Sequence, residues 1–184
     1  MTSAERVAVL GTGLIGTSIA MAGTRAGDQV RGFDTTASVL AAAAERSGLV
    51  PSETLEECVR GATLVFVCTP IPAVAEVVIE ALQRAPDAIV TDVGSVKSHV
   101  LLEVEAKGRA EDLGRYVGGH PMGGSERSGP DHASPSVLDG IVWSWLRGRA
   151  PTRPRPSASK PGRRRSGPAR CGWMPNVTTD SSRW

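Results

Sequence analysis

The stretch YVGGHPMGGSERSGP, residues 116–130, places one histidine, His120, among five glycines. Neighbouring glycines would let the backbone come close to a ligand. A neutral imidazole can accept a proton near physiological pH, so we predict that His120 is a catalytic base. Ser125, Glu126 and Arg127 add a hydroxyl, a carboxylate and a guanidinium within seven residues of it. A histidine with a purely structural role is the alternative, and it fits poorly where glycines leave little side-chain packing.

The segment GTGLIG, residues 11–16, matches the G-x-G-x-x-G pattern of dinucleotide-binding turns. Its first glycine permits the tight turn, its second lets the backbone approach a pyrophosphate, and its third allows a helix to pack closely on a strand. Because the segment opens a predicted helix, N–H groups at the helix N-terminus would face the phosphates. A glycine-rich turn without a ligand is the alternative. We predict cofactor contacts from Gly11, Thr12, Gly13, Leu14, Ile15 and Gly16.

Further polar residues follow other predicted strands. Asp34 is placed to accept hydrogen bonds from the adenosine ribose. A carboxylate there would repel a 2′-phosphate, which favours NAD over NADP as the cofactor. Thr69 and Pro70 would border the same cofactor, although strand termination explains them equally well. Ser95 follows Gly94 at the start of another predicted helix, where it either caps that helix or contacts a substrate.

These residues need a scaffold that brings them together, and the hydrophobic pattern predicts one. Short apolar runs alternate with helical segments, which indicates a Rossmann-type doubly wound parallel sheet with helices on both faces. The carboxyl ends of its strands would bring Gly11, Asp34, Thr69, Gly94 and His120 to one rim, where ligands bind in such sheets. The expected strands are 7–10, 29–33, 63–70, 88–92, 116–120 and one beginning at 141–143, and the expected helices are 14–26, 38–48, 53–60, 72–82 and 95–108.

The composition changes after Trp143. Residues 1–143 carry 11 Lys or Arg against 18 Asp or Glu, whereas residues 144–184 carry ten against one. The second segment also holds six of the 13 prolines and too few aliphatic side chains to offset the entropy of ordering. We therefore expect a dinucleotide-binding domain at 1–143 and a basic, Pro/Arg-rich, disordered tail at 144–184 that is an out-of-frame translation of the gene.

The basic tail could instead bind single-stranded nucleic acid through its arginines and tryptophans. It contains no known binding module, so we expect no nucleic-acid partner.

Cysteine spacing and the lengths of apolar runs argue against disulfides, a metal site and a membrane span. Cys58, Cys68 and Cys171 show neither paired nor metal-type spacing, so we expect reduced thiols and no metal site. No signal peptide is evident and the apolar runs are too short to span a bilayer. We therefore expect a cytoplasmic protein with no membrane partner.

Three segments resemble a known family. VAVLGTGLIGTSIA, TDVGSVK and above all GGHPMGGSERSG are similar to segments of prephenate dehydrogenases, enzymes of tyrosine biosynthesis. The resemblance covers about residues 5–143. It implies an oxidoreductase that uses NAD to decarboxylate prephenate oxidatively to 4-hydroxyphenylpyruvate. Family members continue with the rest of the nucleotide-binding domain and an all-helical domain that forms a homodimer. The resemblance therefore implies a sheet that is incomplete at its C-terminal end, a missing dimerisation domain and a chain that is inactive alone.

The resemblance also implies roles for individual residues. His120 would take the proton of the substrate's ring hydroxyl, and Ser95 would orient that hydroxyl. Ser125 resembles a contact to a substrate carboxylate, and Glu126 resembles an acid that gates the pocket together with an arginine of the helical domain. Three alternatives remain: an arogenate dehydrogenase, another hydride-transfer enzyme such as a β-hydroxyacid dehydrogenase, and a non-catalytic dinucleotide-binding module. The histidine motif argues against the second.

Overall fold

The computed structural model describes residues 4–122 and 127–147. The predicted site residues Ser125 and Glu126, together with Cys171 and the tail beyond Arg147, lie outside the described residues. Within those two ranges, no helix combines the length and the apolar character that crossing a bilayer requires. Nor does the described part of the chain gather three His, Cys, Asp or Glu side chains that could hold a metal ion.

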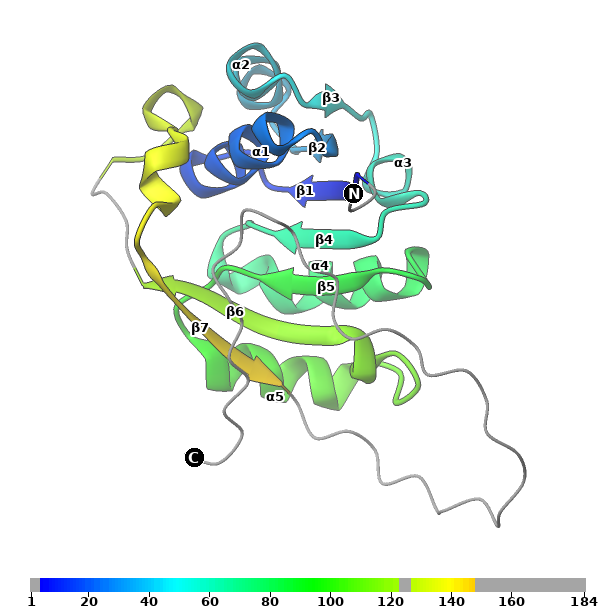
Figure 1. The fold of residues 1–184 in the computed structure, drawn as a ribbon. Coiled ribbons are helices and arrows are strands. Elements are labelled where there is room, and N and C mark those ends of the chain that lie inside the picture. The colour runs from blue at the N-terminus through cyan, green and yellow to red at the C-terminus, as the bar shows by residue number, and fades with distance from the viewer. Residues whose placement is uncertain (1–3, 123–126, 148–184) are drawn as a thin grey trace.

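The described residues form a seven-stranded sheet in the order β3-β2-β1-β4-β5-β6-β7 (Figure 1). Strands β1 to β6 run parallel to one another, and β7 pairs antiparallel with β6 at the edge. The predicted Rossmann-type parallel sheet is confirmed, with an antiparallel edge strand added. The strands are β1 (Arg6–Leu10), β2 (Gln29–Phe33), β3 (Val50–Pro51), β4 (Leu64–Val67), β5 (Ile89–Asp92), β6 (Tyr116–Met122) and β7 (Val142–Arg147).

Helices cover both faces of this sheet (Figure 1). One face is covered by α1 (Leu14–Ala26) and α2 (Ala37–Ser47), against which the short turns Pro130–His132 and Pro135–Leu138 also pack. The other face is covered by α3 (Leu55–Val59), α4 (Ile71–Arg84) and α5 (Lys97–Lys107). A further short turn, Leu113–Arg115, leads into β6.

The central strands are apolar on both sides because each side packs on helices. In β1, Ala8 and Leu10 belong to the core beneath α4, whereas Val7 and Val9 belong to the core beneath α1. The residues of β4 divide in the same alternating way, and all four are buried. This arrangement explains why these strands appear in the sequence as continuous apolar runs.

Strand β6 differs from its predicted form. We expected a strand that ran into a loop at His120, but the strand continues to Met122. The cause is pairing with β7, in which His120 lies opposite Ser144 and Pro121 opposite Trp143. His120 is therefore held by a sheet rather than by a loop.

The edge strand β7 passes through the predicted domain boundary. The strand that we expected to begin at 141–143 runs from Val142 to Arg147. Trp143 stacks on Trp145, with ring centroids 5.4 Å apart. The boundary after Trp143 stays a prediction, since most of the segment beyond it lies outside the described residues.

Candidate functional site

The carboxyl ends of the parallel strands meet along one rim of the sheet, where two pockets adjoin. The first, of about 550 Å³, is lined by Gly11, Asp34 and other residues that follow β1 and β2. The second, of about 470 Å³, is lined by Ser95 and His120 among others. Both pockets share part of their lining, so they adjoin, and the two together are called the cleft below. The shared lining residues are Gly13, Cys68, Thr69, Pro70 and Gly129.

Two glycines of the 11–16 turn are required by close packing. Gly11 has φ +92°, and a β-carbon added to it would lie 2.7 Å from the carbonyl oxygen of Cys68. A β-carbon added to Gly16 would lie 2.0 Å from the carbonyl oxygen of Gly11. Gly13 differs, because nothing lies within 4 Å of the corresponding position and the residue lines both pockets. The first and third glycines therefore serve the fold, and the second leaves space for a ligand.

Different effects on stability are expected when Gly16 and Gly13 are replaced by alanine. Gly16→Ala forces a side chain against backbone atoms, and such overpacking costs about 1–3 kcal/mol or more. In a chain of this size each kcal/mol lowers Tm by about 2–4 °C. Gly13→Ala is the matched control and should change Tm little. The Tm of each variant is measured by thermal unfolding monitored with circular dichroism. Equal Tm values would contradict the close contact at Gly16.

The N-terminus of α1 opens into the cleft. Gly13 is the N-cap and makes no side-chain capping bond, and the first turn contains no acidic residue. Leu14 and Ile15, the first residues of the helix, line the second pocket. The N–H groups at such a helix start have no partner within the helix and attract anions. The geometry suits a phosphate or pyrophosphate at the middle of the cleft.

Asp34 is held in place at one end of the cleft. Its Oδ2 accepts the Thr12 amide at 2.8 Å and the Thr12 hydroxyl at 3.3 Å, and its Oδ1 accepts the Thr36 amide at 2.9 Å. Thr12 itself is fully buried, so its polar atoms orient Asp34 rather than line the cleft. A carboxylate fixed in this way retains acceptor capacity for further hydroxyl groups.

Thr69 and Cys68 lie where the two pockets meet. Among the described residues, the Thr69 hydroxyl is buried and has no hydrogen-bond partner. A buried hydroxyl of this kind commonly has its partner in a bound molecule or water. Burial raises the pKa of the Cys68 thiol. Cys68 is therefore protonated at neutral pH and unsuited to act as a nucleophile.

Ser95 and His120 line the second pocket together, Ser95 from a turn and His120 from a strand. Ser95 is exposed in the turn between β5 and α5, and His120 is half-buried on β6. The capping alternative for Ser95 is wrong. Helix α5 begins at Lys97 with Val96 as its N-cap, and no side chain caps it. Ser95 is thus available to a ligand in this pocket.

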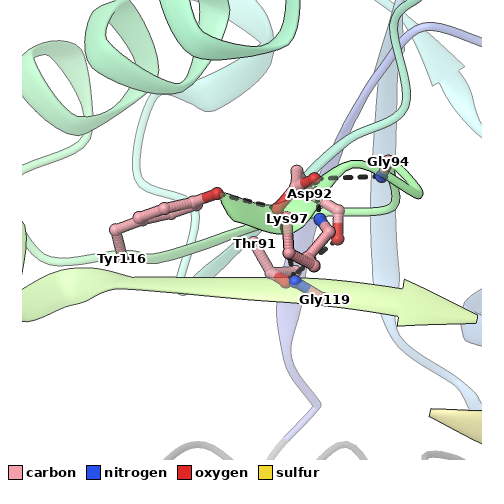
Figure 2. Close-up of polar contacts among 6 residues, drawn as sticks. All are labelled: Thr91, Asp92, Gly94, Lys97, Tyr116 and Gly119. Carbon is pink, nitrogen blue, oxygen red and sulfur yellow. Dashed lines mark hydrogen bonds and ion pairs between the residues drawn. The ribbon is translucent and has the colours of Figure 1, made fainter. Parts of the chain in front are cut away.

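Asp92 is a residue of this rim that the sequence did not single out. It is fully buried at the end of β5, and its carboxylate contacts groups in the turn after β5 and in β6 (Figure 2). An acid that ends a buried strand within TDVGSVK, five residues before a lysine, is the signal that could have identified it.

Comparisons with known proteins show which family the chain is similar to. A family model described as prephenate dehydrogenase, nucleotide-binding domain, matches residues 19–145, more than half of the chain. A probable prephenate dehydrogenase of Streptomyces niveus, NovF, is 35% identical over 136 residues, which are 74% of this chain and 36% of that protein.

Solved structures share the fold. Synechocystis arogenate dehydrogenase has a TM-score of 0.70 and 28% identity. The match covers 79% of this chain and 51% of the Synechocystis chain. Prephenate dehydrogenase from A. aeolicus, in complex with hydroxyphenyl propionate and NAD⁺, has a TM-score of 0.70 and 24% identity. The match covers 81% of this chain and 52% of the A. aeolicus chain. The chain therefore spans about a third to a half of the length of these relatives.

Proposed function

Because this chain belongs to the prephenate dehydrogenase family, we propose that its cleft binds NAD for the oxidative decarboxylation of prephenate to 4-hydroxyphenylpyruvate. The observation that supports this proposal is that the pocket lined by Asp34 and the pocket lined by His120 adjoin and share lining residues. A dinucleotide has a ribose at each end and a pyrophosphate between them, and the cleft offers a group suited to each.

The described residues fit NAD along the whole cleft. Asp34 would accept hydrogen bonds from the adenosine ribose, and the start of α1 at Gly13 would hold the pyrophosphate. The Thr69 hydroxyl, buried without a partner in the described residues, would face the middle of the cofactor. Pro70 would border it from the N-terminus of α4. When bound, NAD supplies the acceptor for a hydride.

The chain's own contribution to the reaction would come from the second pocket. His120 would accept the hydrogen bond of the substrate's ring hydroxyl and take its proton as the carbonyl develops. Ser95, in the same pocket, would orient that hydroxyl. Loss of carbon dioxide from the ring then restores aromaticity. By resemblance, Ser125 would contact a substrate carboxylate and Glu126 would gate the pocket together with an arginine of the helical domain; both residues lie outside the described residues.

The 184-residue chain is expected to bind NAD at least about tenfold more tightly than NADP, because Asp34 would repel a 2′-phosphate. Asp34→Asn removes this charge but keeps an acceptor oxygen, so the preference should shrink. Asp87→Asn is the matched control: it removes an exposed charge before β5, at the opposite end of the sheet, and should leave the ratio unchanged. Calorimetric titration measures both affinities, and a tenfold preference for NADP would refute the role of Asp34.

Arogenate is the alternative substrate, and a solved relative that shares the fold is an arogenate dehydrogenase. Prephenate and arogenate differ in the side chain attached to the ring and not at the hydroxyl that His120 would contact. NADH formation from each substrate by a full-length homologue distinguishes them. The proposal predicts faster turnover of prephenate, and a preference for arogenate would replace it.

A further inference from the structure

One oxygen of a buried carboxylate organises the turn that carries Ser95. Asp92 Oδ2 accepts the backbone amide of Gly94 at 2.9 Å and pairs with the ammonium group of Lys97 (Figure 2). Burial lowers the pKa of Lys97, and the hydrogen bond and charge of Asp92 oppose that shift. These two contacts link Asp92 to the backbone immediately before Ser95 and to the side chain two residues after it.

The other oxygen of Asp92 organises the strand that carries His120. Asp92 Oδ1 accepts the hydroxyl of Tyr116 at 2.8 Å and the backbone amide of Gly119 at 3.3 Å (Figure 2). Burial, together with the charge of Asp92, raises the pKa of Tyr116, so this phenol remains a hydrogen-bond donor. Gly119 directly precedes His120 in β6.

Strands β5 and β6 lie very close together at Gly119. A β-carbon added to Gly119 would lie 2.7 Å from the backbone oxygen of Asp92 and 2.8 Å from the Thr91 hydroxyl oxygen. Only glycine at this position lets β6 come so near to the end of β5. The carboxylate therefore contacts a backbone amide in each segment directly, that of Gly94 and that of Gly119.

We propose that Asp92 is a positioning residue that fixes Ser95 relative to His120, an inference that rests on the roles proposed for those two residues. Its two oxygens are divided between the two segments, one serving the turn and the other the strand. Stability alone is a weak reason for such a network, because replacing buried ion pairs by apolar side chains is often neutral or stabilising. A fully satisfied buried network does specify one arrangement of the groups around it.

The ligand-free 184-residue chain allows a test by NMR. The imidazole Cε1–H signal of His120 is assigned by its loss in His120→Asn. Asp92→Asn is expected to shift or broaden that signal and to speed hydrogen exchange of the Gly119 amide by about tenfold or more. Tyr116→Phe removes one contact to the carboxylate and should act in the same direction, more weakly.

Two internal controls distinguish a specific effect on the position of His120 from a general loss of structure. His132, in the turn Pro130–His132, should keep its signal in both variants. The Val93 amide, which donates to the Val67 carbonyl at 3.1 Å and not to Asp92, should keep its exchange rate. Because no ligand is present, a failure of NAD binding would not affect these measurements.

An unchanged His120 signal in folded Asp92→Asn would overturn the proposal. Equal changes at His132 and at the Val93 amide would also overturn it, because they would show a general loss of structure. If Asp92→Asn does not fold, Tyr116→Phe decides: a shifted His120 signal supports positioning, and an unchanged one contradicts it.

Discussion

A full-length homologue in which the histidine matching His120 is replaced by asparagine is expected to lose about 10²-fold or more of its rate of NADH formation from prephenate. Asparagine retains a polar side chain but cannot take the proton of the ring hydroxyl. In this chain His120 lies on β6, is paired with β7 and lines the same pocket as Ser95. A base held by a sheet is well fixed, so little compensating movement is expected.

The matched control uses a homologue that has a histidine at the position of His132, a residue exposed in a turn outside the cleft, and replaces that histidine. That variant should keep its turnover. Affinity for NAD should be similar in both variants, because the proposed contacts to the adenosine and pyrophosphate do not involve either histidine. Near-normal turnover after the replacement at the position of His120 would contradict its proposed role as the base.

The second large effect is a loss of activity that we expect for the 184-residue chain on its own. Supplied with NAD and prephenate, they are expected to bind the cofactor and to form no detectable NADH. The chain spans between 36% and 52% of the relatives compared above. A substrate carboxylate without its partner and a pocket open to water would each cost several kcal/mol of transition-state stabilisation, and each 1.36 kcal/mol is about tenfold in rate.

The assay for this expectation compares the purified chain with a full-length homologue at equal concentration. A trace of contaminating enzyme would give NADH in every preparation, including His120→Asn of the same chain. Turnover that is present in the 184-residue chain and lost in its His120→Asn variant would therefore contradict the expectation. Calorimetric binding of NAD in the same preparation shows that the chain is folded.

The sheet and its rim could be predicted because their signals are local. Apolar runs such as 64–67 are buried on both faces, and the GTGLIG turn contains its own steric requirements at Gly11 and Gly16. The parallel strands and the helices on both faces were expected from the alternation of strands and helices along the chain. Asp34 and Thr69 could be placed at the rim for the same reason, because each follows the end of a strand.

Other features depend on contacts between distant segments and were not predictable from local pattern. His120 lies in a strand because residues 142–147 pair with β6. The network of Asp92 requires Tyr116, which lies 24 residues along the chain, and the close approach of Gly119. Ser95 was a candidate helix cap because serine is favoured at the start of a helix, yet α5 begins only at Lys97, after the turn that Asp92 contacts.

A single NAD molecule that spans the cleft would contact both of its ends at once. Intermolecular nuclear Overhauser effects between NAD⁺ and the 184-residue chain measure this directly. The nicotinamide protons are predicted to contact Ser95 and His120, and the adenosine ribose protons to contact the residues beside Asp34. Contacts confined to one end, the reverse orientation, or no contacts at saturating NAD⁺ with a folded chain would contradict the proposed site.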